Sequence, residues 1–149
     1  MTIALTLAGP GDLDRLLPLV EACHAEVGID LTDYNRRAGI LPVLQSNPHG
    51  AIWLIGPPGA PVGYVAVGFG WSIEMGGQDA FIDEVFVDQA ARRQGVGHAA
   101  LKSLVKTLSR RGVKALRLEV AGDNRKARSL YESLGFVARE EYFLMTQVL

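Results

Sequence analysis

The chain contains little cysteine: Cys23 stands alone among 149 residues. A single cysteine cannot form a disulfide within the chain, and this fits a reducing, cytoplasmic compartment. Nothing near Cys23 in the sequence marks it as an activated nucleophile, so we interpret it as a small apolar residue on a helix. Disulfide-stabilised secreted scaffolds are therefore excluded.

Strong net charge and long apolar runs are also lacking. The formal net charge is −1, so no broad basic surface is available for nucleic acid or for an acidic membrane. No apolar run approaches the roughly 20 residues of a membrane span. The N-terminus has no basic leader before the turn at Gly9-Pro10, so we expect no secretory signal. The histidines have no companions at metal-ligand spacing, and no metal site is predicted.

Hydrophobic residues make up 48% of the chain, which is enough for the core of one domain over residues 1–149. Apolar spacing and turn residues predict alternating strands and helices, with Trp71 to Asp79 as a loop. The predicted strands are residues 3–8, 51–55, 62–67, 81–87 and 115–120, with one or two more in 136–148; the predicted helices are 13–27, about 33–44, 98–111 and 124–134. This order predicts an α/β fold with a mixed sheet.

The stretch from Phe81 to Leu104 reads as a strand, a glycine-bearing turn and the start of a helix. Glycines at 95 and 97 let the backbone approach a ligand, and the free N–H groups of the helix's first turn point toward it. Arg92 and Arg93 add positive charge at the same turn. The sequence therefore predicts a binding site for a phosphate or pyrophosphate.

The same glycines also fit a dinucleotide fingerprint, Gly95-x-Gly97-x-x-Ala100, with Glu119 about 20 residues further on for a ribose hydroxyl. Two features oppose this interpretation. Residues 88–94, with two arginines, separate the first glycine from its strand, and too little chain follows Glu119 for a second nucleotide-binding half.

Two motifs together resemble the signatures of the GNAT N-acetyltransferase superfamily. The first is Arg92-x-x-Gly95-x-Gly97 after the strand, and the second is Asn124-x-x-Ala127-x-x-Leu130-Tyr131 followed by Gly135-Phe136. With Leu118-Glu119-Val120 they cover about residues 80–137. The resemblance implies the GNAT acyl-CoA N-acyltransferase fold: a mixed, mostly antiparallel sheet with a splayed parallel pair and helices on both faces.

The resemblance also implies acetyl-CoA as cosubstrate, without a metal. Main-chain groups of Val85 and Val87 would contact the pantetheine arm and the thioester carbonyl. Asn124 would contact the cofactor arm while capping its helix, and Tyr131 would bind near the thioester and protonate the departing thiolate. The residues implied for the pyrophosphate are Arg92, Arg93, Gln94, Gly95, Val96, Gly97 and His98.

Three carboxylates compete for the general base that frees the amine. The family's patterns favour Glu119 or Asp83, working through water, with Glu84 binding the acceptor's positive charge. Strand alternation predicts that Asp83 and Glu84 point to opposite faces. The residues expected to rim the acceptor pocket are Asp30, Asp33, Tyr34, Trp71, Glu74 and Gln78.

The implied activity is acetyl transfer from acetyl-CoA to a primary amine by direct attack in a ternary complex. The acceptor would be a small-molecule amine or a peptide N-terminus, and a homodimer is possible. The alternative is a non-catalytic acyl-CoA-binding module that senses or recruits, which would need the phosphate turn but no acid–base pair.

Overall fold

The computed structural model describes residues 1–149, which form two compact units, Met1–Glu119 and Val120–Leu149. The first unit holds a five-stranded sheet and three α-helices, and the second holds one α-helix. None of these helices is both long enough and apolar enough to cross a membrane.

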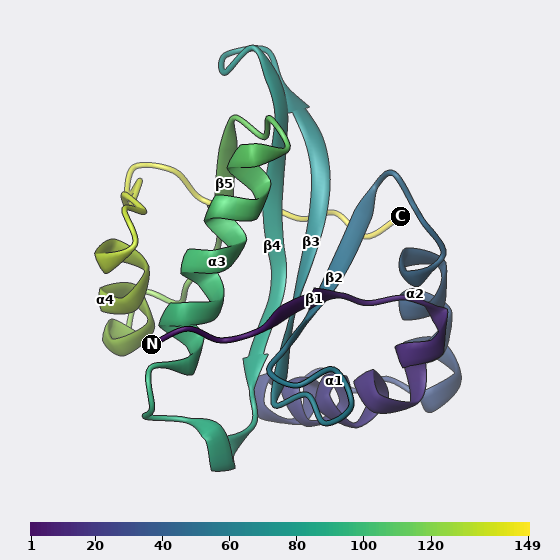
Figure 1. The fold of residues 1–149 in the computed structure, drawn as a ribbon. Helices are drawn as coiled ribbons and strands as arrows, with labels where there is room; N and C mark the ends of the chain where they lie inside the picture. Colours follow the sequence, from purple (N-terminus) through teal and green to yellow (C-terminus); the bar gives the residue numbers. More distant parts are fainter. The chain divides into compact units, whose positions relative to one another are not determined.

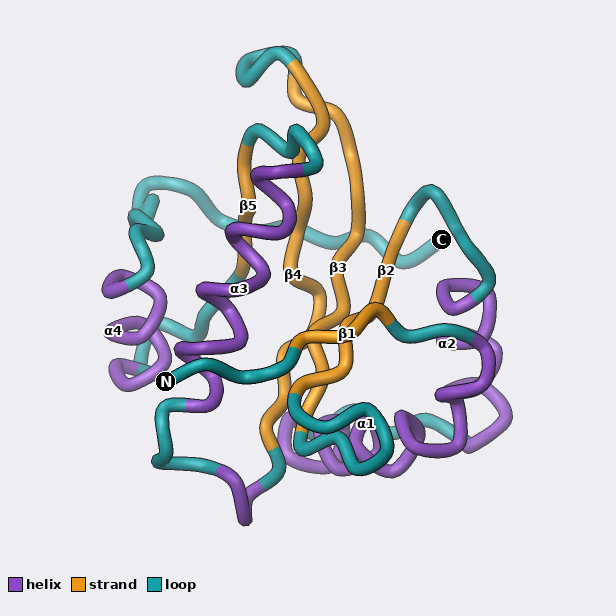
Figure 2. The backbone as a smooth tube through the Cα atoms, viewed as in Figure 1, coloured by secondary structure: helices purple, strands orange, loops and turns teal.

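The sheet of the first unit has the strand order β1-β2-β3-β4-β5 (Figures 1 and 2). Its strands are β1 (Leu5–Leu7), β2 (Gly50–Ile55), β3 (Gly63–Ser72), β4 (Gly77–Val87) and β5 (Ala115–Leu118). The first four pair antiparallel, and β5 lies parallel to β4 after a crossover through a helix. The predicted mixed, mostly antiparallel sheet is confirmed.

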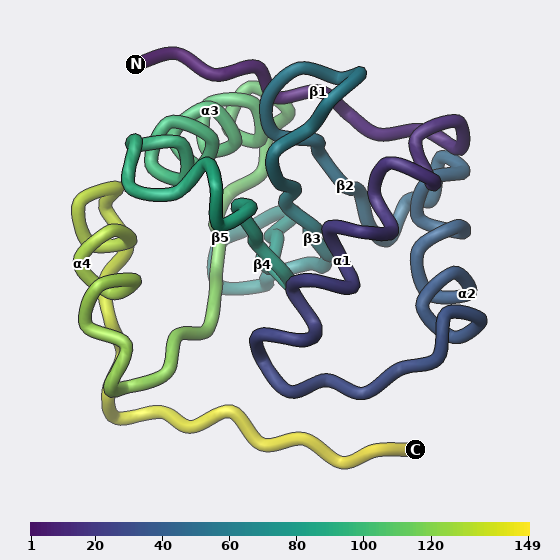
Figure 3. Tube along the Cα trace, turned by 90° about the horizontal axis from the view of Figure 1, so that it is seen from below, coloured from purple at the N-terminus to yellow at the C-terminus, as the bar shows by residue number.

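Helices cover both faces of this sheet. The helices of the first unit are α1 (Leu13–Val27), α2 (Asp33–Leu44) and α3 (Val96–Arg110), with short 3-10 turns η1 (Pro10–Asp12) and η2 (Gln89–Ala91). In the view of Figure 3, α1 and α2 lie on one side of the strands and α3 on the other. Gly28 ends α1 in the left-handed region at φ 75°, and the Thr32 hydroxyl caps α2 by accepting the Asn35 N–H at 3.1 Å.

Alternating residues of the central strands build the two cores. Ile52 and Leu54 pack into the cluster formed by α1 and α2. Trp53, on the opposite face of β2, has the Arg111 guanidinium 5.6 Å from its ring centroid. The fully buried Leu104 of α3 belongs to that second face. Each such side chain contributes about 1.5–3 kcal/mol by leaving water.

The hairpin of β3 and β4 is longer than predicted. Trp71 pairs with Gln78 and Ser72 with Gly77, so the predicted loop shrinks to the turn at 73–76. The Ser72 hydroxyl accepts the Met75 N–H at 3.1 Å inside this turn. Polar and glycine residues suggested a loop, but a strand's backbone pairing depends little on side-chain polarity once the hairpin is started.

The second unit contains α4 (Arg125–Ser133), which begins where the sequence predicts. Asn124 caps it through a hydrogen bond accepted from the Ala127 N–H at 3.2 Å, and Gly135 follows at φ 94°. The strands predicted in 136–148 are wrong, because that stretch has no strand structure. A strand needs a partner for its N–H and C=O groups, and this unit contains no other strand.

Candidate functional site

The turn between β4 and α3 has the backbone of an anion site. Arg93 at φ 62° and Gly95 at φ 76° both take the left-handed conformation, which costs a non-glycine residue about 1–2 kcal/mol. No side chain caps α3, so the amides at the start of its first turn, from Val96 to His98, have no partner in the protein. Amides presented this way attract anions.

This turn fits a diphosphate. The first turn of α3 carries no acidic residue, and the side chain of Arg93 is exposed and makes no hydrogen bond or ion pair with the protein. A Cβ at Gly95 would meet only the Met1 sulfur at 3.9 Å, so the backbone there lies open. The side chain of Gln94 contacts its own turn, where its amide nitrogen lies 3.4 Å from the Ala90 carbonyl oxygen.

Arg92, by contrast, is engaged with the protein. Its Nε–H donates to the Val87 carbonyl oxygen at 2.7 Å, and its Nη2 donates to Glu26 at 2.6 Å. The guanidinium also lies 5.3 Å from the centroid of the Phe86 ring. Arg92 therefore ties the turn to the end of β4 and to α1, and Arg93 is the cation left free for a ligand.

Strands β4 and β5 part where the resemblance expects a cofactor cleft. Their parallel pairing covers Asp79–Ile82 and Ala115–Leu118 and stops there. Beyond Ile82 the β5-facing edge of β4 has no strand partner, and this leaves main-chain groups near Val85 available. The Val87 carbonyl is occupied by Arg92.

A bulge in β4 overturns the prediction that Asp83 and Glu84 face opposite ways. Val67 pairs with Ile82 while Ala66 pairs with Glu84, so Asp83 is an extra residue with no partner on β3. A bulge interrupts the alternation of side chains. Both carboxylates line the same cavity.

That cavity lies within the first unit, among α1, α2 and the strands β2, β3 and β4, and has a volume of about 390 Å³. Apolar side chains form most of its wall, including Leu31, Ile40 and Phe81. Its polar lining includes Asp83 and Glu84, together with His24, Asn35, Arg36, His49 and Tyr64.

Glu84 is held by two donors. The Tyr64 hydroxyl donates to one of its oxygens at 2.7 Å, and His24 Nε2 lies 2.8 Å from the other. Arg36 Nε–H reaches His24 Nδ1 at 3.5 Å. Since an arginine N–H only donates, Nδ1 must accept, which places the ring proton on Nε2, facing Glu84. The chain of contacts fixes the Glu84 carboxylate in place.

Asp83 is the freer and more exposed acid. No hydrogen bond to its carboxylate is formed by the protein, and burial together with the nearby charge of Glu84 raises its pKa. Desolvation likewise raises the pKa of the Tyr64 phenol, which therefore stays protonated and able to donate to Glu84.

Glu119 does not join these acids. It is exposed, follows the last residue of β5, and is not among the residues that line the cavity. The described chain also has no group of three or more His, Cys, Asp or Glu side chains arranged to hold a metal.

Tyr131, the predicted acid, belongs to the second unit. It lies on α4, where its ring meets that of Phe136 edge-on with centroids 6.0 Å apart. Burial raises the pKa of its phenol, which keeps the proton in place at neutral pH.

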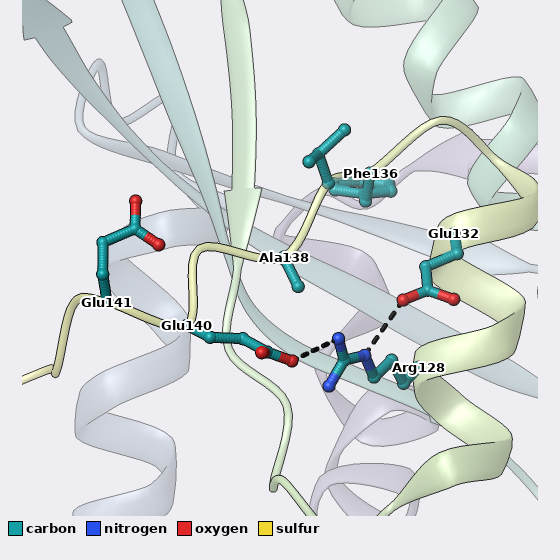
Figure 4. A pocket seen from close by; sticks show the side chains of 7 residues that line it. Arg128, Glu132, Phe136, Ala138, Glu140 and Glu141 are labelled. Carbon is teal, nitrogen blue, oxygen red and sulfur yellow. Dashed lines mark hydrogen bonds and ion pairs between the residues drawn. The ribbon is translucent and has the colours of Figure 1, made fainter.

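A second hollow of about 460 Å³ lies inside this unit. Figure 4 shows Arg128 at its edge, between the carboxylates of Glu132 and Glu140 that it pairs with. Neither Asn124 nor Tyr131 lines it. We assign it no role.

Sequence reasoning missed His24, Arg36 and Tyr64. Their spacing carries no motif, and helical periodicity alone would have placed His24 on the same face as Leu16 and Val20 of α1. None of the six residues predicted to rim the acceptor pocket lines the cavity. From this part of the chain the cavity is lined instead by Leu31, between α1 and α2, and by Asn35 and Arg36 on α2.

Comparisons with known proteins agree with this fold. The sequence model of the "Acetyltransferase (GNAT) family" matches residues 14–136. Ribosomal protein bS18-alanine N-acetyltransferase of Escherichia coli K12 is 42% identical over 71 residues, 46% of this chain and 48% of that protein. Thialysine N-epsilon-acetyltransferase of Bos taurus is 29% identical over 90 residues, 55% of this chain and 51% of that protein. The chain thus matches about half the length of these curated relatives.

Solved structures extend the likeness over the whole chain. An integron cassette protein from the mobile metagenome of Cole Harbour Salt Marsh is 33% identical, with a TM-score of 0.80 over 97% of this chain and 90% of that one. A possible acetyltransferase from Clostridium difficile 630 shares the fold at 20% identity, with a TM-score of 0.84 over 100% of this chain and 99% of that one. With the family model covering most of the sequence, this chain belongs to the GNAT family of acetyltransferases.

Proposed function

We propose that the chain is an N-acetyltransferase that uses acetyl-CoA as cosubstrate and acetylates a primary amine by direct attack in a ternary complex. The observation that carries the proposal is the combination, within one unit, of an amide-lined anion turn at α3 and a cavity lined by two adjacent carboxylates. A module that only binds acyl-CoA would need the turn but not the paired acids.

On the cosubstrate side, the residues act by binding and orienting. The amides of residues 93–98 and the Arg93 guanidinium hold the diphosphate, supported by the fit of that turn to an anion. The free edge of β4 near Val85 holds the pantetheine arm. The bound acetyl thioester supplies the acyl group.

On the acceptor side, Asp83 takes a proton from the ammonium group. Its raised pKa brings the carboxylate closer to the basicity that a general base needs. Glu84 accepts hydrogen bonds from Tyr64 and His24, which fix its carboxylate in a position to attract the acceptor's cation. We favour Asp83 over Glu119 because Glu119 does not line the cavity.

The free amine then forms the N–C bond while the C–S bond breaks. Tyr131 gives its proton to the leaving thiolate, and the second proton lost by the nitrogen restores the phenol. Net, one ammonium and one thioester become one amide, one thiol and one released proton. Asn124 joins Tyr131 as a proposed cofactor contact, beside its role as helix cap.

Replacement of Tyr131 by phenylalanine tests this assignment. We expect kcat for any accepted amine to fall about 100-fold or more, because general-acid assistance is lost, while acetyl-CoA affinity changes little. The measurement is thiol release against acetyl-CoA, with affinity from thermal shift. Tyr142→Phe is the matched control, since that ring is exposed. Unchanged turnover in Tyr131→Phe would remove Tyr131 from the mechanism.

The name of one relative gives an alanine of ribosomal protein bS18 as the acetylated group, and the name of the other gives thialysine. A small amine or a peptide N-terminus is therefore the acceptor class we propose, in a cytoplasmic enzyme consistent with the unpaired, buried Cys23. A homodimer stays a prediction.

A further inference from the structure

Arg36 on α2 is a buried cation without a carboxylate partner. Only 7% of Arg36 is exposed, yet no acid lies within ion-pair distance of its guanidinium. Its Nη2 donates to the Leu31 carbonyl at 3.1 Å, and its Nε to His24 at 3.5 Å. Burying a charge without a counter-charge is costly, so such a residue calls for an explanation.

The third guanidinium nitrogen, Nη1, has no hydrogen-bond partner in the protein. No fully enclosed side-chain nitrogen or oxygen lacks a partner, so Nη1 must open onto free space. Arg36 lines the acid-bearing cavity. Arg36 is thus a lining residue of the same cavity as Asp83 and Glu84, and its Nη1 has N–H groups that no protein atom uses.

The distance between these opposite charges is short. The His24 ring contacts Arg36 through Nδ1 and Glu84 through Nε2. The guanidinium and the Glu84 carboxylate are thus separated by one imidazole ring. A ligand that meets both must carry its own cation and anion only a few bonds apart.

The rest of the wall limits the ligand further. Leu31, Ile40, Val43, Ile52 and Phe81 contribute apolar surface. The volume of about 390 Å³ lies toward the lower end of the roughly 300–1,000 Å³ typical of small-molecule pockets. The occupant is accordingly a small molecule with an apolar body.

From these features we infer that the acceptor is a small free amino acid with an apolar side chain, whose carboxylate is bound by Arg36 while its amine lies at Asp83 and Glu84. The inference rests on the proposed acetyltransferase function. It deepens that function by naming the acceptor's second charged group. A peptide N-terminus carries a neutral carbonyl where a free amino acid carries its carboxylate.

The test is a set of three acceptors that share one apolar skeleton, leucine, leucinamide and isopentylamine, assayed by thiol release with wild type and Arg36→Gln. We expect Arg36→Gln to lower kcat/KM for leucine about 10- to 100-fold, mainly through KM, because a charge-assisted hydrogen bond is lost. The two neutral-ended amines should lose threefold or less. Comparing each acceptor across the two proteins cancels the different basicities of the amines.

Arg37→Gln is the matched control, because Arg37 neighbours Arg36 on α2 but pairs with Asp33 at the surface. It should leave all three values unchanged. Equal losses for all three acceptors in Arg36→Gln would mean that Arg36 only supports His24, and would overturn the inference. Leucinamide turned over by wild type as well as leucine, with an equal effect of Arg36→Gln, would point to a peptide N-terminus and overturn it too.

A measurement on wild type alone covers the case in which Arg36→Gln does not fold. We expect 4-methylpentanoate to compete with the acceptor at least tenfold better than 4-methylpentanamide, which lacks the negative charge; equal inhibition would overturn the inference. If wild type acetylated isopentylamine and a carboxylate on the acceptor gave no advantage, only this inference would be contradicted. If it bound acetyl-CoA but turned over no amine, the proposed function would be contradicted as well.

Discussion

The two halves of the proposed site are built differently. The anion turn is mainly a backbone feature of consecutive positions, 93–98, and most of its donors are amides. The acceptor cavity is a side-chain feature, assembled from two helices and three strands. Backbone sites require particular residues only where the chain needs an unusual conformation, as at Gly95. Side-chain sites depend on each contributor separately.

This difference implies that the two halves tolerate change differently. A family can keep one turn for one cosubstrate while the cavity is rebuilt for each acceptor. In this chain the acids of the cavity depend on a single irregularity, the extra residue Asp83 in β4. Without the bulge, alternation would send one of the two carboxylates to the α3 face.

The largest effect should come from the acid in that bulge. Asp83→Asn removes the proposed base without changing its size, so kcat/KM should fall about 10²- to 10⁴-fold. In wild type, activity should rise with pH through a pKa higher than that of an ordinary aspartate, because the carboxylate must be deprotonated to act. Steady-state rates across pH would show this limb, and the limb should vanish in the variant.

The same substitution, Asp83→Asn, should lower activity without lowering stability. The fold raises the pKa of Asp83, through burial first and the charge of Glu84 second. Protonation is therefore favoured in the folded state, and stability falls as pH rises from the unfolded pKa through the folded one. Asp83→Asn should accordingly unfold at the same temperature as wild type or a higher one at neutral pH. A lower melting temperature with full activity would contradict both assignments.

What could be predicted from the sequence differs between the same two halves of the proposed site. The turn, the cap at Asn124, the glycine ends of α1 and α3 and the parallel crossover were predictable, because glycine, asparagine and apolar spacing report local backbone geometry. The bulge at Asp83 was not, since one extra residue leaves no mark in composition. Nor were His24, Arg36 and Tyr64, which meet Glu84 or one another only after distant elements pack.

A substitution in the anion turn, the backbone half of the site, should have a smaller effect. Gly95→Ala places a Cβ on a left-handed residue, a strain of about 1–2 kcal/mol, with only the Met1 sulfur 3.9 Å away. Relief of that strain should move the amides and raise the KM for acetyl-CoA about tenfold. Gly112→Ala is the control, because Gly112 at φ 85° ends α3 with nothing near its Cβ position. It should lower the melting temperature comparably and leave that KM alone.

The smallest effect separates the two adjacent arginines. Arg93→Gln should raise the KM for acetyl-CoA about two- to fivefold, since an exposed charge contributes about 1 kcal/mol or less, and added salt should shrink the difference. Arg92→Gln should instead lower the melting temperature, because it loses the contacts to Val87 and Glu26. Thermal unfolding and the KM for acetyl-CoA, measured on both variants, distinguish the binding role of Arg93 from the stabilising role of Arg92. If Arg92→Gln kept full stability and alone weakened acetyl-CoA binding, Arg92 rather than Arg93 would be the ligand cation, and side chains would count in this half as they do in the cavity.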